Sequence, residues 1–270
     1  METAYKHLDY SASQMKHNYG RNVHILAQPS LLTRLARACS AECDSLELVR
    51  HVRSLYREMA SIVANVEFPR RQVRLKTRMF DHHRQARYEG EVIDPKTKVV
   101  CVAIARAGLV PSQVACEMFM NLVDRQHVRQ DYVFANRKTD EKGRVVGADL
   151  SGSKIGGGIG GSILILPDPM AATGGSISAA IDHYKNLKIG KPKKVIALHL
   201  IATPEYIRRI RKDHPEAFIY AIRLDRSLSP KQVLWEKPGK AWAEERGLND
   251  LQYIVPGGGG FGELMNNAVE

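Results

Sequence analysis

The chain has 270 residues, of which 44% are hydrophobic and 26% are charged, as in an ordinary globular protein. No apolar run reaches the length of a membrane-spanning helix, and the N-terminus lacks the apolar region of a signal peptide. Four cysteines without metal-binding spacing fit a reduced, cytoplasmic setting. The net charge of +11 suits a polyanionic small substrate or a nucleic acid, and charge alone does not choose between them.

The first third of the chain predicts an arm followed by helices. Residues 1–21 are polar and mixed, which indicates a polar N-terminal arm, and residues 22–26 predict a short strand. We expect Ser30 to cap a helix that runs through Ala38, and Asp44 with Glu47 to start a long helix. The apolar face of that long helix is Leu46, Val49, Val52, Tyr56, Met59, Val63 and Val66.

Residues 68–88 are strongly basic. The cations in this stretch are Arg70, Arg71, Arg74, Lys76, Arg78, Arg84 and Arg87, with His82 and His83. A solvated face or a subunit contact is one interpretation, and an RNA-binding patch is the other. We favour the first, because no recognised nucleic-acid motif accompanies the charge.

Residues 98–105 predict a buried strand that leads into Arg106 and a loop of small residues. Open parallel sheets bind ligands at such carboxyl ends, and an arginine there can hold a pyrophosphate through two hydrogen bonds. The alternative is a loop arginine that only forms a salt bridge. A helix over 111–122 and a strand over 131–135 are expected to follow.

Residues 136–161 are polar and then glycine-rich, which predicts a long, mobile functional loop. The glycine run at 156–161 is interpreted as a hinge. It is not a dinucleotide-binding fingerprint, because it precedes a strand rather than following one.

Residues 163–176 carry the clearest chemical signal. Four aliphatic residues predict a buried strand, and an apolar period of helical type begins at Ser176. The backbone N–H groups at a helix N-terminus bind phosphate, and Gly174 and Gly175 permit close approach. Thr173 adds a hydroxyl donor, and Asp168 can accept hydrogen bonds from sugar hydroxyls. The pattern favours a sugar-phosphate site over an ordinary strand-to-helix turn.

The remainder predicts a strand over 195–201, a helix from Thr203 through Lys212 and a strand over 217–224. Residues 253–263 are rich in glycine. Backbone groups in such a loop can match the donor–acceptor edge of a pyrimidine, and the alternative is a flexible tail.

Two strings resemble one family. Residues 168–176 resemble the phosphoribosyl-pyrophosphate loop of type I phosphoribosyltransferases, in the Asp-Pro-Met-Leu-Ala-Thr-Gly-Gly-Ser form of uracil phosphoribosyltransferases, from which only Ala171 differs. Residues 253–264 resemble that family's Tyr-Ile-Val-Pro-Gly-Leu-Gly-Asp-Ala-Gly-Asp-Arg. The implied fold is an α/β, type I phosphoribosyltransferase-like parallel sheet flanked by helices, with an N-terminal helical arm and a hood over the site. Residues 22–270 would form one such domain, with residues 227–247 as an insertion.

The resemblance implies a role for each matching residue. The implied catalytic residues are Arg106, Asp168 and Arg137, with Arg144 as a rival of Arg137. The implied phosphoribosyl-pyrophosphate contacts are Asp168, Pro169, Met170, Ala171, Ala172, Thr173, Gly174, Gly175 and Ser176. The implied uracil contacts are Tyr253, Ile254, Gly259, Gly260 and Phe261, mainly through backbone groups.

The implied reaction, one of pyrimidine salvage, converts uracil and 5-phosphoribosyl 1-pyrophosphate to uridine monophosphate (UMP) and pyrophosphate. Mg²⁺ is expected to arrive on the pyrophosphate, without a protein metal site, and the protein is expected to be a cytoplasmic homodimer or homotetramer without a membrane or nucleic-acid partner. Two departures stand out: Gly260 replaces the family's first acid, and Leu264 replaces its arginine. They leave open a catalytically weak or inactive relative that acts as a nucleotide-binding or RNA-binding regulator. Restoring the acid by Gly260→Asp is expected to raise activity or ligand affinity.

Overall fold

The computed structural model describes residues 4–139 and 145–268, with side chains described outside 136–149. Its main feature is an eight-stranded sheet in the order β1-β10-β9-β7-β4-β5-β6, with β8 paired to β9. The strands are β1 (Val23–Ile25), β4 (Val99–Ala105), β5 (Val128–Thr139), β6 (Val145–Lys154), β7 (Ile163–Pro167), β8 (Met170–Ala171), β9 (Lys194–Ala202) and β10 (Phe218–Leu224). Every pairing is parallel except that of β5 with β6, so the predicted parallel α/β sheet is confirmed.

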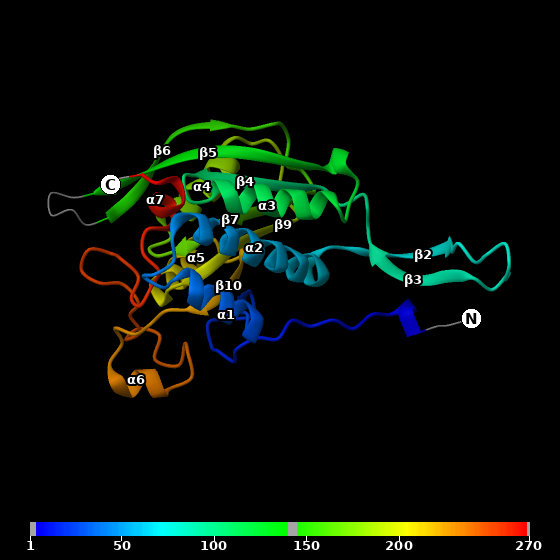
Figure 1. Cartoon of the computed structure of the whole chain (residues 1–270). Helices are drawn as coiled ribbons and strands as arrows, with labels where there is room; N and C mark the ends of the chain where they lie inside the picture. The colour runs from blue at the N-terminus through cyan, green and yellow to red at the C-terminus, as the bar shows by residue number, and fades with distance from the viewer. Residues whose placement is uncertain (1–3, 140–144, 269–270) are drawn as a thin grey trace.

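Helices cover both faces of this sheet (Figure 1). They are α1 (Pro29–Ala38), α2 (Ser45–Glu67), α3 (Leu109–Met120), α4 (Gly175–Asn186), α5 (Pro204–Asp213), α6 (Lys231–Trp235) and α7 (Phe261–Asn266), with 3-10 turns η1 (Ala4–Lys6) and η2 (Arg125–His127). Neighbouring strand residues point to opposite faces. Cys101 therefore joins the core beneath α1, α2 and α3, whereas Val102 joins the core beneath α4 and α5.

Two of the three predicted N-terminal capping residues are confirmed. The Asp44 carboxylate accepts the Glu47 N–H at 2.8 Å, and the Thr203 hydroxyl oxygen accepts the Tyr206 N–H at 3.0 Å. The predicted cap at Ser30 is wrong, because α1 begins one residue earlier, at Pro29, whose ring is suited to the first helical position. Ser30 instead lies inside the helix.

The predicted apolar face of α2 is correct in its middle and wrong at its start. Val52, Tyr56, Met59 and Val63 are buried, but Leu46 is 58% exposed. Leu46 lies in the first turn, where the helix has no neighbour to cover that side chain.

The basic stretch 68–88 forms most of a two-stranded antiparallel hairpin, β2 (Arg70–Lys76) and β3 (Arg87–Ile93), which the sequence did not predict. The hairpin projects from the body of the protein, and the N-terminal segment runs beside it (Figure 1). The Leu8 N–H donates to the Glu91 carboxylate at 3.2 Å, which ties this segment to β3. Part of the polar arm is therefore packed, and Tyr19 at its end is buried.

The predicted long loop over 136–161 is wrong for its first part, because β5 continues to Thr139 and pairs with β6. We call this strand pair the hood. The glycine run is anchored rather than free to act as a hinge. The buried Asp131 carboxylate accepts the Gly156 N–H at 2.9 Å, and Arg129 donates to the carbonyls of Gly157 and Gly158 at 2.8 Å each. In the described part of the chain, no helix has the length and apolar character that crossing a membrane requires.

Candidate functional site

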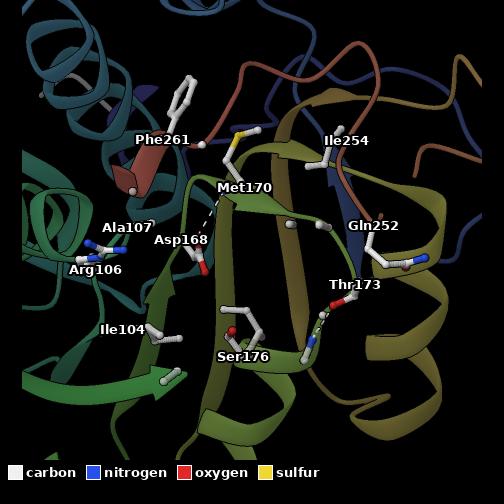
Figure 2. Close-up of a pocket in the computed structure, with 18 of the residues that line it drawn as sticks. Ile104, Arg106, Ala107, Asp168, Met170, Thr173, Ser176, Gln252, Ile254 and Phe261 are labelled. Atoms are coloured by element: carbon white, nitrogen blue, oxygen red, sulfur yellow. Dashed lines mark hydrogen bonds between the residues drawn. The ribbon is translucent and has the colours of Figure 1, made fainter. Parts of the chain in front are cut away.

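A cavity of about 670 Å³ lies at the carboxyl ends of β4 and β7. Its wall comes from five separate parts of the chain, which are residues 104–107, residues 168–177, Tyr206, residues 251–263 and the hood (Figure 2). In an open parallel sheet this edge is where ligands bind. The fold therefore brings the two motif strings, some eighty residues apart in the sequence, to one cavity.

The segment after β7 has the backbone arrangement of an anion cradle, and we call it the anion cradle. Gly174 has φ +81° and stands just before the first residue of α4, and the Thr173 hydroxyl oxygen accepts the Gly175 N–H at 3.5 Å. The first N–H groups of an α-helix have no acceptor within the helix, and the helix dipole is positive there. These groups, with the hydroxyls of Thr173 and Ser176, face the cavity and suit a phosphate.

The cradle is held from behind by β9 and α5. The Thr203 hydroxyl donates to the Ala172 carbonyl at 2.7 Å. His199 Nδ1 lies 2.6 Å from the Asp168 carbonyl oxygen, and His199 Nε2 lies 2.6 Å from the Tyr206 hydroxyl. Because a carbonyl only accepts, Nδ1 carries the proton and Nε2 accepts from Tyr206. Burial lowers the pKa of His199 to about 4, against a smaller raising effect of the Asp168 hydrogen bond, so its ring is neutral at neutral pH.

Arg106 follows β4 and faces this cradle across the cavity (Figure 2). Its side chain is 49% exposed, and its Nη2 atom lies 3.6 Å from Oε1 of Glu263, in the first turn of α7. Within the described cavity wall, the charged side chains are those of Arg106, Asp168 and Glu263. A guanidinium that is half exposed beside a cavity can bind an incoming polyphosphate.

An ion pair between the partly buried Arg223 and the buried Asp225 fixes the glycine-rich segment 256–260. Arg223 donates to both Asp225 carboxylate oxygens, at 2.6 and 2.8 Å. Arg223 also donates to the Gly257 carbonyl at 2.7 Å, and the Gly257 N–H donates to Asp225 at 2.8 Å. Both backbone groups of Gly257 are thus held by one pair of side chains, which we call the Arg223–Asp225 clamp. The clamp positions the following residues, Gly259 to Phe261, in the cavity wall.

Most of the residues that the sequence singled out meet at this cavity. They are Arg106, Asp168, Met170, Ala171, Ala172, Thr173, Gly174, Gly175, Ser176, Tyr253, Ile254, Gly259, Gly260 and Phe261. Among the described residues, Pro169 is the exception, because it is buried and does not line the cavity. Its carbonyl accepts hydrogen bonds from the N–H groups of Leu200 and Ile201, at 3.1 Å each. The backbone of Arg137 lies in β5 opposite Ala148. The side chain of Arg137, and the whole of Arg144, lie outside the described residues.

The sequence missed several residues of the site. His199, Tyr206 and the Arg223–Asp225 clamp carry no local motif, since they act across elements that only the folded chain brings together. Gln252 also lines the cavity and has φ +67°, a conformation that a glutamine rarely adopts. A sequence signal existed only for Glu263, the one acid left in the last motif.

The model of the uracil phosphoribosyltransferase family matches residues 45–241. The chain is 29% identical over 175 residues to the uracil phosphoribosyltransferase of Thermococcus sibiricus, an alignment that covers 65% of this chain and 62% of that protein. It is 29% identical over 196 residues to the uracil phosphoribosyltransferase of Pyrobaculum islandicum, covering 73% of this chain and 76% of the relative.

A solved structure supports the fold. The AQ2163 protein from Aquifex aeolicus superposes with a TM-score of 0.65 at 21% sequence identity, covering 90% of this chain and 97% of that one. The likeness at this identity concerns the arrangement of the backbone.

Proposed function

The chain belongs to the uracil phosphoribosyltransferase family, and we propose that it transfers the phosphoribosyl group of 5-phosphoribosyl 1-pyrophosphate to uracil. The products would be UMP and pyrophosphate. The observation that carries the proposal is the shared cavity, in which the segment at the start of α4 and the residues Tyr253, Ile254 and Gly259–Phe261 form parts of one wall. One part suits the 5′-phosphate of a nucleotide, and the other suits the edge of its base.

The reaction forms a bond from N1 of uracil to C1 of the ribose and breaks the bond from C1 to the pyrophosphate oxygen. The bonding electron pair leaves with pyrophosphate, and the N1 proton is released. As the leaving group departs, C1 gains positive character, so catalysis requires that the charge on pyrophosphate be stabilised and that the base be held in line.

We assign Arg106 to the pyrophosphate and Asp168 to the ribose hydroxyls, with residues 172–176 on the 5′-phosphate. The position of Asp168 between the cradle and Arg106 supports this assignment (Figure 2). A second arginine, Arg137 of the hood or Arg144, would cover the leaving group. Uracil would contact backbone groups of Ile254, Gly259 and Gly260, with Tyr253 and Phe261 beside it.

We propose that Mg²⁺ enters with the pyrophosphate as part of the substrate. Among the side chains that the structure describes, those of residues 4–135 and 150–268, no three of histidine, cysteine, aspartate or glutamate gather at one place. The cation would neutralise the leaving group, which is the chemistry that a substrate-borne Mg²⁺ supplies. Arg106 and the cradle would then orient the complex.

A turnover assay with uracil and labelled 5-phosphoribosyl 1-pyrophosphate tests the proposal. We expect UMP to form with uracil and not with hypoxanthine, in a reaction that requires magnesium. Formation of a purine nucleotide would show that the base is misassigned. Failure of every base, with tight binding of UMP, would indicate a non-catalytic relative.

The basic β2–β3 hairpin favours a second candidate, an RNA-binding regulator on the same fold. Several of its cations, including Arg71, Arg74 and Arg78, are exposed. RNA binding through this hairpin would weaken steeply with salt concentration, and reversing the charge of these three arginines would flatten the slope. Binding that is weak, or that the reversal does not change, would remove this candidate.

A further inference from the structure

The backbone conformation of Gly260 does not require a glycine. Its φ of −81° and ψ of 85° lie near the inverse γ-turn, which other residues adopt readily. The neighbouring Gly257 and Gly259 differ, because their φ values of +62° and +81° fall in the left-handed region that favours glycine. The absence of a side chain at position 260 therefore needs another physical reason.

The space that a side chain at position 260 would enter is taken by a carboxylate. A Cβ atom added to Gly260 would lie 2.5 Å from Oε2 of Glu263, so a side chain at position 260 would displace the flexible Glu263 carboxylate from where it lies. The first turn of α7 brings residue 263 back over residue 260, and the Leu264 N–H donates to the Gly260 carbonyl at 2.9 Å. The Glu263 carboxylate therefore lies close to where a family acid at position 260 would lie.

This carboxylate is directed at the cavity. The Glu263 side chain is 19% exposed, lines the same cavity as Asp168, and forms the 3.6 Å ion pair with Arg106. An ion pair in which the arginine is half exposed is weak, since water competes for it. A polyphosphate can therefore replace Glu263 as the partner of Arg106, which leaves the carboxylate beside the bound substrate.

We propose that Glu263 replaces the acid missing at position 260 and binds the ribose-pyrophosphate side of the substrate, and that Gly260 is the space that admits it. The carboxylate would accept hydrogen bonds from ribose hydroxyls or from water on the substrate's cation. This inference rests on the proposed function. The inference reverses the expectation that Gly260→Asp raises affinity. A new carboxylate at position 260 would lie against the Glu263 carboxylate, and the two negative charges would repel.

Four variants test whether the site needs one carboxylate at this place. Affinity for 5-phosphoribosyl 1-pyrophosphate with magnesium is measured by calorimetry, and thermal unfolding confirms that each variant is folded. Glu263→Gln keeps the shape and loses the charge, so we expect affinity to fall roughly tenfold to hundredfold, as for a hydrogen bond to a charged group. Gly260→Asp alone is expected to lower affinity as well.

The decisive variant is Gly260→Asp combined with Glu263→Gln, which returns a single carboxylate to the same space. We expect it to bind at least several times more tightly than either single variant. Its matched control, Gly260→Asn with Glu263→Gln, has the same volume without a charge and is expected to stay as weak as Glu263→Gln. Recovery in both double variants would show that shape, not charge, matters, and would overturn the inference.

Two further outcomes are distinguishable. If wild-type protein binds the substrate and Glu263→Gln binds it equally well, the inference is wrong while the proposed function stands. If wild-type protein binds neither 5-phosphoribosyl 1-pyrophosphate nor UMP, the proposed function fails and the inference falls with it.

Discussion

His199 shows how one buried side chain supports a site that it does not line. Its ring connects the Asp168 carbonyl to the Tyr206 hydroxyl through two short hydrogen bonds, so it links the end of β7 to α5. Because burial holds its pKa at about 4, the ring keeps one donor and one acceptor over the physiological range. Protonation would remove the acceptor that Tyr206 uses.

This lowered pKa predicts acid sensitivity. Between about pH 6.5 and pH 4 the unfolded chain binds a proton at residue 199 that the folded chain does not. The contribution of His199 to the free energy of unfolding is therefore complete above pH 6.5 and is lost as the pH falls towards 4. His199→Asn keeps a donor for the Asp168 carbonyl and removes the titrating ring.

Urea unfolding at pH 7.5 and pH 5 measures the effect. We expect the wild type to exceed His199→Asn by about 1–3 kcal/mol at the higher pH, and the difference to shrink at the lower. Burial also lowers the pKa values of His17, His24 and His214. These histidines are present in both proteins, so their effects cancel in the difference between the two free energies of unfolding. An equal difference at both pH values would contradict the assignment.

In the proposed reaction, Asp168 is the residue that would bind the ribose hydroxyls. Replacing it by asparagine keeps the shape of the side chain and removes the charge that strengthens its hydrogen bonds to ribose hydroxyls. We expect kcat/KM for 5-phosphoribosyl 1-pyrophosphate to fall roughly tenfold to hundredfold. Asp182→Asn, at an exposed carboxylate of α4, is the control and should leave kinetics unchanged. Activity near that of the wild type in Asp168→Asn would exclude this role.

At the scale of an element, the Arg223–Asp225 clamp predicts a selective loss of base binding. Asp225→Asn weakens the Arg223–Asp225 ion pair and one of the two hydrogen-bonded contacts to Gly257, whereas neither Arg223 nor Asp225 lines the cavity in which the anion cradle lies. We expect the KM for uracil to rise roughly tenfold while the KM for 5-phosphoribosyl 1-pyrophosphate stays within about twofold. Steady-state kinetics with each substrate varied in turn gives both values. An equal rise in both would mean that the clamp supports the whole fold rather than the base segment.

The turn before α4 predicts a stability effect. Gly174 has φ +81°, and an added Cβ would lie 3.2 Å from the Tyr206 ring. We expect Gly174→Ala to lower the free energy of unfolding by at least about 1–2 kcal/mol, the cost of a left-handed conformation. Gly160→Ala is the matched control, because φ there is not positive and no atom lies within 4 Å of the added Cβ. Denaturant unfolding of both variants measures the effect, and similar results for the two would contradict it.

Whether an element could be predicted from the sequence depends on whether local signals or pairing with another element stabilise it. Buried parallel strands and capped helices, such as β7 and the start of α2, depend on local signals and were predicted. The part of the hood after Ala135 was taken for a loop, because residues 136–154 lack an apolar run and the two strands are stabilised by pairing with each other. The β2–β3 hairpin was missed for the same reason.

The same distinction applies to the residues of the candidate site. Residues 170–176 could be predicted because the anion cradle is built from consecutive residues, and Tyr253 to Phe261 because the last motif is continuous. Pro169 was included with its neighbours although its ring is buried. Glu263 could not be assigned a role, because its position over Gly260 and beside Arg106 depends on how α7 meets β4.

At the scale of the whole molecule, we propose that the protein is a homodimer or homotetramer. A two-stranded hairpin is marginal by itself in water, yet β2–β3 projects from the body with Leu75 and Met79 about half exposed (Figure 1). A partner subunit would cover these side chains. Light scattering should give a multiple of 30.2 kDa.

Leu75→Gln with Met79→Gln tests the surface. We expect the double variant to dissociate to smaller species at a concentration where the wild type stays assembled. Leu264→Gln is the control, because Leu264 is similarly exposed but lies on α7. A monomeric wild type would rule out the assembly, and an unchanged mass in the hairpin variant would rule out this surface.

The most direct test of the central claim is a crystal structure of the protein with bound UMP. We predict that the 5′-phosphate lies against the backbone N–H groups of residues 173–176, that the ribose hydroxyls contact the Asp168 carboxylate, and that the base rests on residues 253–261. Density for the nucleotide outside this cavity, or for a phosphate directed away from the start of α4, would contradict the account.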